Sequence, residues 1–291
     1  MLELDLSKVQ RSVAGPSRPH DRIDLADVKN RFSQLCNDRS LDCSKKVSVD
    51  VLGHNYEVTH GALAIAAVTS CTTATDASMM ISAGVLARNA SKAGLHPKPW
   101  VKTILAPGSR ATEDILDAAG LMPALRDLGF YTCGFGCMSC IGNSGPVLPG
   151  MHDIANEIEL ASVLSGNRNF EGRISPDVSQ NYLCAPALVI AYSLAGTIDF
   201  DFETEALGID AEGNSIYLKD IWPDDEEVTL LLEKSRTKEV FDRAAVGLFD
   251  GDERWQSLGK EASDVFAWDP DSTYVRRAPY FDGMGLSLIH I

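Results

Sequence analysis

From His60 to about Leu194, short apolar runs alternate with segments whose apolar residues recur at helical spacing. The clearest run, residues 61–68 (GALAIAAV), predicts a buried strand. A helix is expected after Asp76, which is a good N-cap residue, and Gly94 supplies its stop. Because each crossover between parallel strands needs a covering helix, this alternation predicts an α/β domain built on a mostly parallel sheet.

The same pattern assigns the rest of the chain. Strands are expected at 101–105, 130–133 and 160–164, and helices at 113–119, 122–128 and 187–194. Residues 1–45 are polar and are interpreted as a segment that leads in from a preceding domain, and residues 46–240 as the α/β domain itself. Residues 241–284 are interpreted as a linker toward a further domain, and residues 285–291 as a tail left by a cloning or sequencing adapter.

Composition argues against several classes of protein. The 26 Lys and Arg residues against 41 Asp and Glu residues give a net charge of −15, which disfavours nucleic acid and anionic membranes as partners. The longest nearly apolar stretch, 185–196, is too short to span a membrane, and no secretory signal is visible, so a cytoplasmic location is expected. Seven cysteines fit metal-ligand or core thiols better than a disulfide framework.

Side chains with useful chemistry follow three of the predicted strands, at the sheet edge where α/β proteins bind ligands. They are Cys71 after the first strand, Cys137 and Cys140 after the third, and Asn167, Arg168 and Arg173 after the fourth. Cys137-x-x-Cys140 lies in a glycine-rich loop that lets the backbone approach a bulky metal centre. The simpler alternative is two small buried residues in a turn.

Three thiolates around a 4Fe-4S cluster leave one iron open, and an open iron is a Lewis acid that can hold a hydroxyl and a carboxylate. Arginine forks bind carboxylates, so Arg168 and Arg173 predict a small acid with several carboxylates, although surface ion pairs would also explain them. A competing hypothesis uses Cys133, Cys137 and Cys140, whose C-x3-C-x2-C spacing is that of radical SAM enzymes. The third ligand distinguishes the two: Cys71 or Cys133.

The sequence around these residues resembles the aconitase family, in the branch that contains aconitase A and the iron regulatory proteins. The matching motifs, in family order, are Thr69-Ser-Cys-Thr, Lys102-Thr-x-x-x-Pro-Gly-Ser, Gly134-Phe-Gly-Cys-Met-Ser-Cys-Ile-Gly-Asn-Ser-Gly-Pro, Leu164-Ser-Gly-Asn-Arg-Asn-Phe-Glu-Gly-Arg, Tyr217-Leu-Lys-Asp-Ile-Trp-Pro and Asp271-Ser-Thr-Tyr. The resemblance runs from about residue 2 to residue 281. It implies a three-layer α/β/α domain similar to the third domain of the family.

The resemblance also implies roles for individual residues. Cys71, Cys137 and Cys140 would ligate a 4Fe-4S cluster, Arg168 and Arg173 would contact substrate carboxylates, and Asn167 would be a polar neighbour of the cluster. The remaining cysteines, at 36, 43, 133 and 184, would be ordinary core or surface thiols. The implied reaction is that of a hydro-lyase of the tricarboxylic acid cycle, which converts citrate to isocitrate through cis-aconitate.

Two departures from the family pattern bear on function. The family's general base is a serine of a C-terminal swivelling domain, and its acid-base His and Asp residues belong to an N-terminal domain. This chain is therefore expected to be part of a longer protein and inactive alone. Thr73 stands where the family commonly has Asn, which leaves 2-methylcitrate or 2-methylisocitrate dehydration as an alternative. An iron-regulated RNA-binding protein is a further alternative, against which the net charge argues.

Overall fold

The computed structural model describes residues 3, 5–72, 75–138, 143–167, 172–258 and 264–283. The chain divides into two compact units, residues 1–246 and residues 247–291. Each unit is described by itself. Among the described residues, none of the helices combines the length and the apolar character that crossing a membrane requires.

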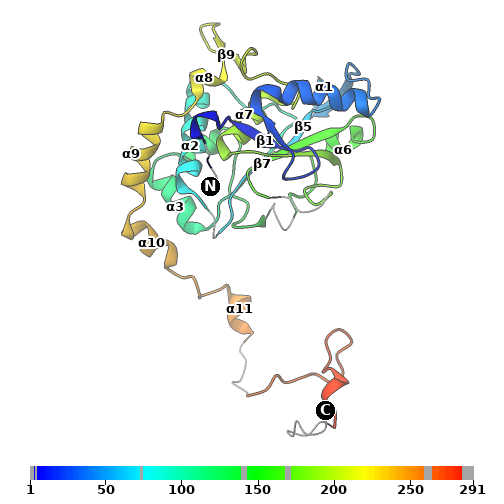
Figure 1. The fold of residues 1–291 in the computed structure, drawn as a ribbon. Coiled ribbons are helices and arrows are strands. Elements are labelled where there is room, and N and C mark those ends of the chain that lie inside the picture. The colour runs from blue at the N-terminus through cyan, green and yellow to red at the C-terminus, as the bar shows by residue number, and fades with distance from the viewer. Residues whose placement is uncertain are drawn as a thin grey trace. The chain divides into compact units, whose positions relative to one another are not determined.

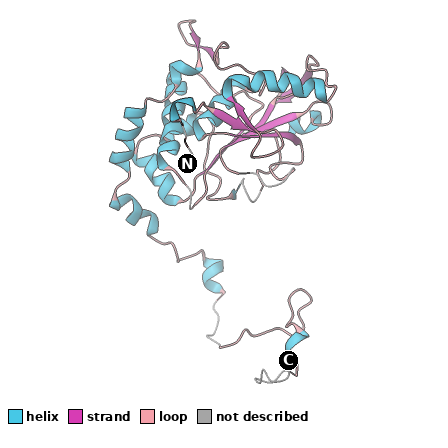
Figure 2. Ribbon diagram, viewed as in Figure 1, coloured by secondary structure: helices cyan, strands magenta, loops and turns pink. Residues whose placement is uncertain are grey.

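A six-stranded sheet lies at the centre of the first unit, in the order β2-β1-β8-β7-β5-β6 (Figures 1 and 2). Its strands are β1 (Ser12–Ala14), β2 (Arg22–Asp24), β5 (Leu63–Thr69), β6 (Lys102–Ala106), β7 (Leu160–Leu164) and β8 (Val178–Leu183). Strands β6, β5, β7 and β8 run parallel, with Ile65 opposite Lys102, and β1 and β2 add an antiparallel edge. The prediction of a mostly parallel α/β sheet is confirmed.

Helices cover one face of this sheet and a thinner layer covers the other. The first layer includes α1 (Val28–Asp38), α2 (Ala77–Lys92), α3 (Arg110–Ala118), α4 (Met122–Asp127) and α7 (Pro186–Ala195). The second contains α6 (Pro149–Ile154) and a separate hairpin of β3 (Val47–Val51) and β4 (His54–Val58). Along β5, Ala66 and Val68 face the first layer while Ile65 and Ala67 face the second, which is why the whole strand is buried.

The remaining elements of this unit follow α7. They are β9 (Gly208–Ile209), β10 (Ser215–Ile216), α8 (Leu218–Ile221), α9 (Asp225–Ser235) and α10 (Lys238–Ala245). Two short 3-10 turns, Leu6–Lys8 and Leu25–Asp27, lie near the N-terminus. Val240 and Ala244 are the buried residues of α10, and Arg243 forms an ion pair with Asp114 of α3 at 3.5 Å. The structure thus continues the first unit past residue 240, where the linker is predicted to start.

Local sequence explains where the long helices begin and end. The Asp76 carboxylate accepts a hydrogen bond from the Ser78 amide at 2.9 Å, which caps α2, and Gly94 adopts a left-handed φ of +72° just past its end. Asp224 caps α9 in the same way by accepting from the amides of Glu226 and Glu227. The predictions of the Asp76 cap and the Gly94 stop are confirmed.

Residues 1–45 differ from the expected lead-in segment. Strand β1 pairs with both β2 and β8, and Val28 and Phe32 of α1 are buried in the main core. These residues are therefore continuous with the α/β unit, because their apolar side chains complete its core. The strand expected at 130–133 is reduced to a single parallel bridge between Thr132 and Leu105.

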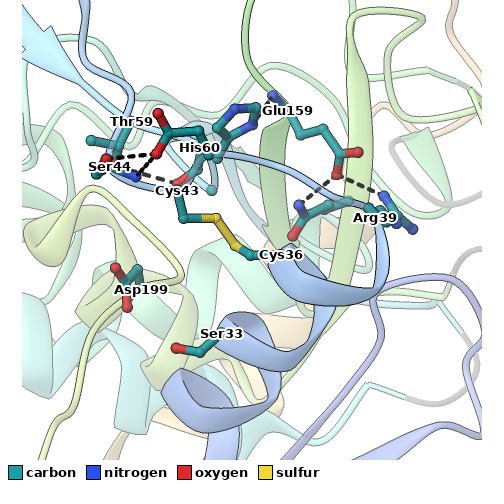
Figure 3. Close-up of a disulfide and its surroundings, with 12 residues drawn as sticks. Ser33, Cys36, Arg39, Cys43, Ser44, Thr59, His60, Glu159 and Asp199 are labelled. Atoms are coloured by element: carbon teal, nitrogen blue, oxygen red, sulfur yellow. Dashed lines mark hydrogen bonds and ion pairs between the residues drawn. A yellow bond between two sulfur atoms is a disulfide. The ribbon is translucent and has the colours of Figure 1, made fainter.

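Cys36 and Cys43 form a disulfide, so the expectation that both are thiols is wrong. Cys36 lies in the last turn of α1, and the chain returns to it seven residues later (Figure 3). The Cα atoms of the two cysteines are 6.2 Å apart, within the range that a disulfide bridges. Between the two cysteines, Arg39 donates to the Glu159 carboxylate at 2.6 Å.

The second unit contains little regular structure. Within its described residues are α11 (Glu253–Ser257), which Asp252 caps by accepting from the Trp255 amide, and a 3-10 turn at Pro279–Phe281. Phe266 and Trp268 form an edge-to-face pair with ring centroids 4.8 Å apart.

Candidate functional site

A pocket of about 570 Å³ lies where β5, β7 and β8 end. Cys71 follows β5, Asn167 follows β7 and Cys184 follows β8, and all three line this pocket. The first turns of α2 and α7 complete the wall with Met79 and Pro186. The pocket therefore occupies the carboxyl edge of the parallel strands, where ligands bind in open α/β sheets.

Ser165 fastens the ends of β5 and β7 together. Its hydroxyl accepts from the Thr69 amide at 2.8 Å and donates to the Thr69 carbonyl at 2.7 Å. Because Cys71 lies two residues after Thr69 and Asn167 two residues after Ser165, this clamp sets both pocket residues at one edge. The prediction that Cys71 and Asn167 share an edge agrees with this geometry.

A turn at Pro107 and Gly108 supports the Cys71 segment. The Thr75 hydroxyl donates to the Cys71 carbonyl, and the Thr72 hydroxyl donates to the Gly108 carbonyl at 2.7 Å. A Cβ on Gly108 would lie 2.0 Å from Thr75 Oγ1 and 2.9 Å from the Cys71 carbonyl oxygen. Only glycine allows this close approach of the two segments.

The segment that carries Cys137 is fastened to the same turn. The Gly136 amide donates to the Pro107 carbonyl at 2.8 Å, and Gly136 has a φ of +68°. A Cβ on Gly136 would lie 2.9 Å from Thr72 Oγ1. Cys137 is half-buried and Cys71 is exposed, and both follow segments that meet at Pro107 and Gly108.

Cys133 is held differently. Its amide donates to the Leu105 carbonyl at 3.0 Å, and its thiol donates to the same oxygen at 3.4 Å. It thus runs beside β6, and of the described predicted cysteines Cys71 lines the pocket whereas Cys133 and Cys137 do not.

Of the two predicted arginines, Arg173 is half-buried within the described part of the chain. Asn143 Nδ2 donates to the Arg173 carbonyl at 2.9 Å, and the next amide, that of Ser144, donates to the Ile174 carbonyl at 3.0 Å. Residues 143–146, which follow the predicted pair Cys137 and Cys140, therefore pack along the chain that carries Arg173. Arg168 and Cys140 lie outside the described residues.

The start of helix α7 favours an anion at this edge, and the Asp76 carboxylate is a negative group that also lines the pocket. Helix α7 begins at the pocket wall, and Ala185 at its N-cap has no side chain that could satisfy its first amides. Burial raises the pKa of the Cys184 thiol well above its usual range, which keeps that thiol neutral. Within residues 5–72, 75–138, 143–167 and 172–258, no three His, Cys, Asp or Glu side chains are grouped as a metal site.

Three residues of this region were not predicted from the sequence. Ser165 gave no signal beyond its position after a predicted strand, and Cys184 gave none because β8 was not predicted. Lys102, at the start of β6, donates to two carbonyls near the cysteine segment. Lys102, Ser144 and Pro146 belong to motifs that resemble the family, but the contacts use main-chain carbonyls, which a motif of residue types does not reveal.

Comparison with known proteins decides the family. The family model described as aconitase (aconitate hydratase) matches residues 1–196. The chain belongs to the aconitase family. The motifs that resemble that family in the sequence are thereby explained, and so is the α/β fold that carries them.

Curated relatives with the name aconitate hydratase A align with nearly the whole chain. The protein of Thermus thermophilus is 49% identical over 298 residues, which is 98% of this chain and 33% of the relative. That of Corynebacterium jeikeium is 45% identical over 97% of this chain and 36% of the relative. That of Rickettsia bellii is 45% identical over 98% of this chain and 32% of the relative. The chain spans about a third of the length of these relatives.

Proposed function

We propose that this chain supplies the cluster-binding part of an aconitate hydratase, a hydro-lyase that interconverts citrate and isocitrate through cis-aconitate. The observation that carries the proposal is the alignment of 98% of the chain with the Thermus thermophilus aconitate hydratase A at 49% identity. The remaining parts of such an enzyme, including its general base, would come from further aconitase domains. A cytoplasmic location stays a prediction.

The family implies an iron-sulfur cluster, and we propose Cys71, Cys137 and Cys140 as the ligands of a 4Fe-4S cluster. Thiolates are the donors that iron-sulfur clusters require. The fit is supported by the turn at Pro107 and Gly108, to which the segments of both Cys71 and Cys137 are fastened. Bound by three thiolates, the cluster would supply one open iron as a Lewis acid.

The chain's own residues would bind and orient the substrate. Arg173 and Arg168 carry planar guanidinium groups that match carboxylates in geometry. The uncapped start of α7 at the pocket wall presents amides to an anion, because Ala185 offers them no side-chain acceptor. A substrate with several carboxylates would satisfy both groups at once, which a neutral ligand would not.

The radical SAM hypothesis has less support. It requires Cys133 in place of Cys71, yet Cys133 lies beside β6 and Cys71 lines the pocket. The family match over residues 1–196 also favours the hydro-lyase.

A chimeric enzyme tests the proposal. The segment of the Thermus thermophilus aconitate hydratase A that aligns with this chain is replaced by the chain, and cis-aconitate formation from citrate is followed by ultraviolet absorbance. We expect turnover of citrate, and Arg173→Lys should raise KM because one carboxylate contact is lost. Turnover of 2-methylcitrate in preference to citrate would assign the alternative substrate. A folded chimera that binds iron but dehydrates neither acid would contradict the proposal.

A further inference from the structure

Lys102 is a half-buried cation that fixes main chain. It is the first residue of the edge strand β6, and its Nζ donates to the Ser144 carbonyl at 2.7 Å and to the Pro146 carbonyl at 2.8 Å. Desolvation lowers the pKa of this ammonium, so the surroundings are partly shielded from water. Both acceptors belong to the short segment that follows the predicted pair Cys137 and Cys140.

The opposite side of that segment contacts the chain of Arg173. Asn143 Nδ2 donates to the Arg173 carbonyl at 2.9 Å, and the Ser144 amide donates to the Ile174 carbonyl at 3.0 Å. Ile174 is 1% exposed and belongs to the core. Ser144 therefore uses its amide toward one neighbour and its carbonyl toward Lys102, which links β6 to the chain of Arg173.

Gly145 makes room for the ammonium. Its φ is +73°, and a Cβ there would lie 3.1 Å from Lys102 Nζ. The segment turns around the cation, so that carbonyls from both sides of Gly145 reach it.

We propose that Lys102 is a positioning residue. It holds residues 143–146 in place, and these residues in turn position the main chain of Arg173 and the end of the segment that carries Cys137 and Cys140. The link to cluster and substrate rests on the proposed function. The simpler account is that Lys102 is a solubilising charge on an edge strand. That account predicts no change in residues 143–146 when Lys102 is replaced, because a solubilising charge does not hold neighbouring main chain in place.

Amide hydrogen exchange of the chain without iron separates these accounts. Lys102→Met should speed exchange about tenfold in a peptide covering 143–146, because the Ser144 amide, which donates to the Ile174 carbonyl, is no longer held in place by the charge-assisted hydrogen bonds of Lys102. Lys102→Arg should retain protection, since its guanidinium can still donate to both carbonyls. Lys92→Met, which removes an exposed lysine at the end of α2, is the matched control and should not change this peptide.

Peptides of β5 serve as the internal reference for folding. If Lys102→Met lost protection there as well, Lys102→Gln would decide, because it keeps the polar surface and removes the charge. Selective loss at 143–146 in either variant supports the proposal. Wild-type exchange of that peptide in folded Lys102→Met overturns it.

Iron and sulfide reconstitution forms the second arm. If the wild type takes up a cluster, Lys102→Met should hold less iron and show an altered EPR signature, while Lys92→Met should match the wild type. An unchanged signature and iron content would overturn the link to the cysteine segment. If the wild type itself takes up no cluster, the proposed function fails, and the exchange arm still decides whether Lys102 positions the chain of Arg173.

Discussion

The substitution Gly108→Ala tests how the structure positions Cys71. Gly108 does not adopt a left-handed φ, so alanine adds a methyl group without backbone strain at that residue. The new Cβ would lie 2.0 Å from Thr75 Oγ1, 2.9 Å from the Cys71 carbonyl oxygen and 3.0 Å from Ser70 Oγ. Either the turn or the Cys71 segment must move.

The expected free-energy cost follows from these contacts. Overpacking costs about 1–3 kcal/mol. The displaced Thr75 hydroxyl also loses its hydrogen bond to the Cys71 carbonyl, which adds about 1 kcal/mol. If about 2 kcal/mol of this total opposes the cluster-binding arrangement, the cluster should be held about 30-fold more weakly.

The assay is anaerobic reconstitution followed by competition with an iron chelator. Gly208→Ala is a matched control, because Gly208 also lacks a left-handed φ and its Cβ would meet only the tip of Leu95, at 2.6 Å. We expect Gly108→Ala to lose iron at about 30-fold lower chelator concentration and Gly208→Ala to behave as the wild type. Removing the nearest clash with Thr75→Ala in the Gly108→Ala chain should restore part of the retention.

Equal iron retention by wild type and Gly108→Ala, with both chains folded by circular dichroism, would refute this reasoning. It would mean that the contacts between the turn and Cys71 do not determine cluster binding.

Three further predictions concern stability. The Cys36–Cys43 disulfide predicts that alkylation of the denatured, unreduced chain leaves Cys36 and Cys43 unlabelled, and its reduction should cost about 2 kcal/mol; labelling of both without a reductant would contradict the pairing. Burial lowers the pKa of His60 from its ordinary value of 6.5, so stability contributed by neutral His60 should fall as the pH drops below 6.5, and thermal melts of His60→Gln should show a shallower decline over that range. Asp76→Ala should destabilise the chain by about 1 kcal/mol in urea unfolding, because the cap of α2 is lost, whereas Asp76→Asn should cost much less.

Strands buried on both faces were predictable from the sequence, and strands with buried polar residues were not. In β5 every residue is apolar or small, so the run itself identifies the strand. Strand β8 contains Gln180 and Asn181, which are buried because Gln180 donates to Glu159 and Asn181 accepts from Ser162. Those partners are distant in sequence, and a pattern of hydrophobic residues does not detect them.

The candidate site was predictable to the extent that it follows strand ends. Cys71 and Asn167 follow neighbouring parallel strands, and topology alone brings them to one pocket. The link between the segments of Cys71 and Cys137 depends on a turn at Gly108, whose role appears only when the segments meet. The role of Lys102 depends on main-chain carbonyls 42 and 44 residues away in sequence, and a motif of residue types does not reveal which main-chain atoms meet.

The central claim is that Cys71, Cys137 and Cys140 hold an iron-sulfur cluster. Its most direct test is anaerobic iron and sulfide reconstitution of the wild type and of single Cys→Ser variants at positions 71, 133, 137 and 140, with iron and sulfide counted and EPR recorded. The account predicts loss of the cluster in the variants at 71, 137 and 140 and retention in Cys133→Ser. A cluster that requires Cys133 and survives Cys71→Ser would contradict this claim and favour the radical SAM hypothesis.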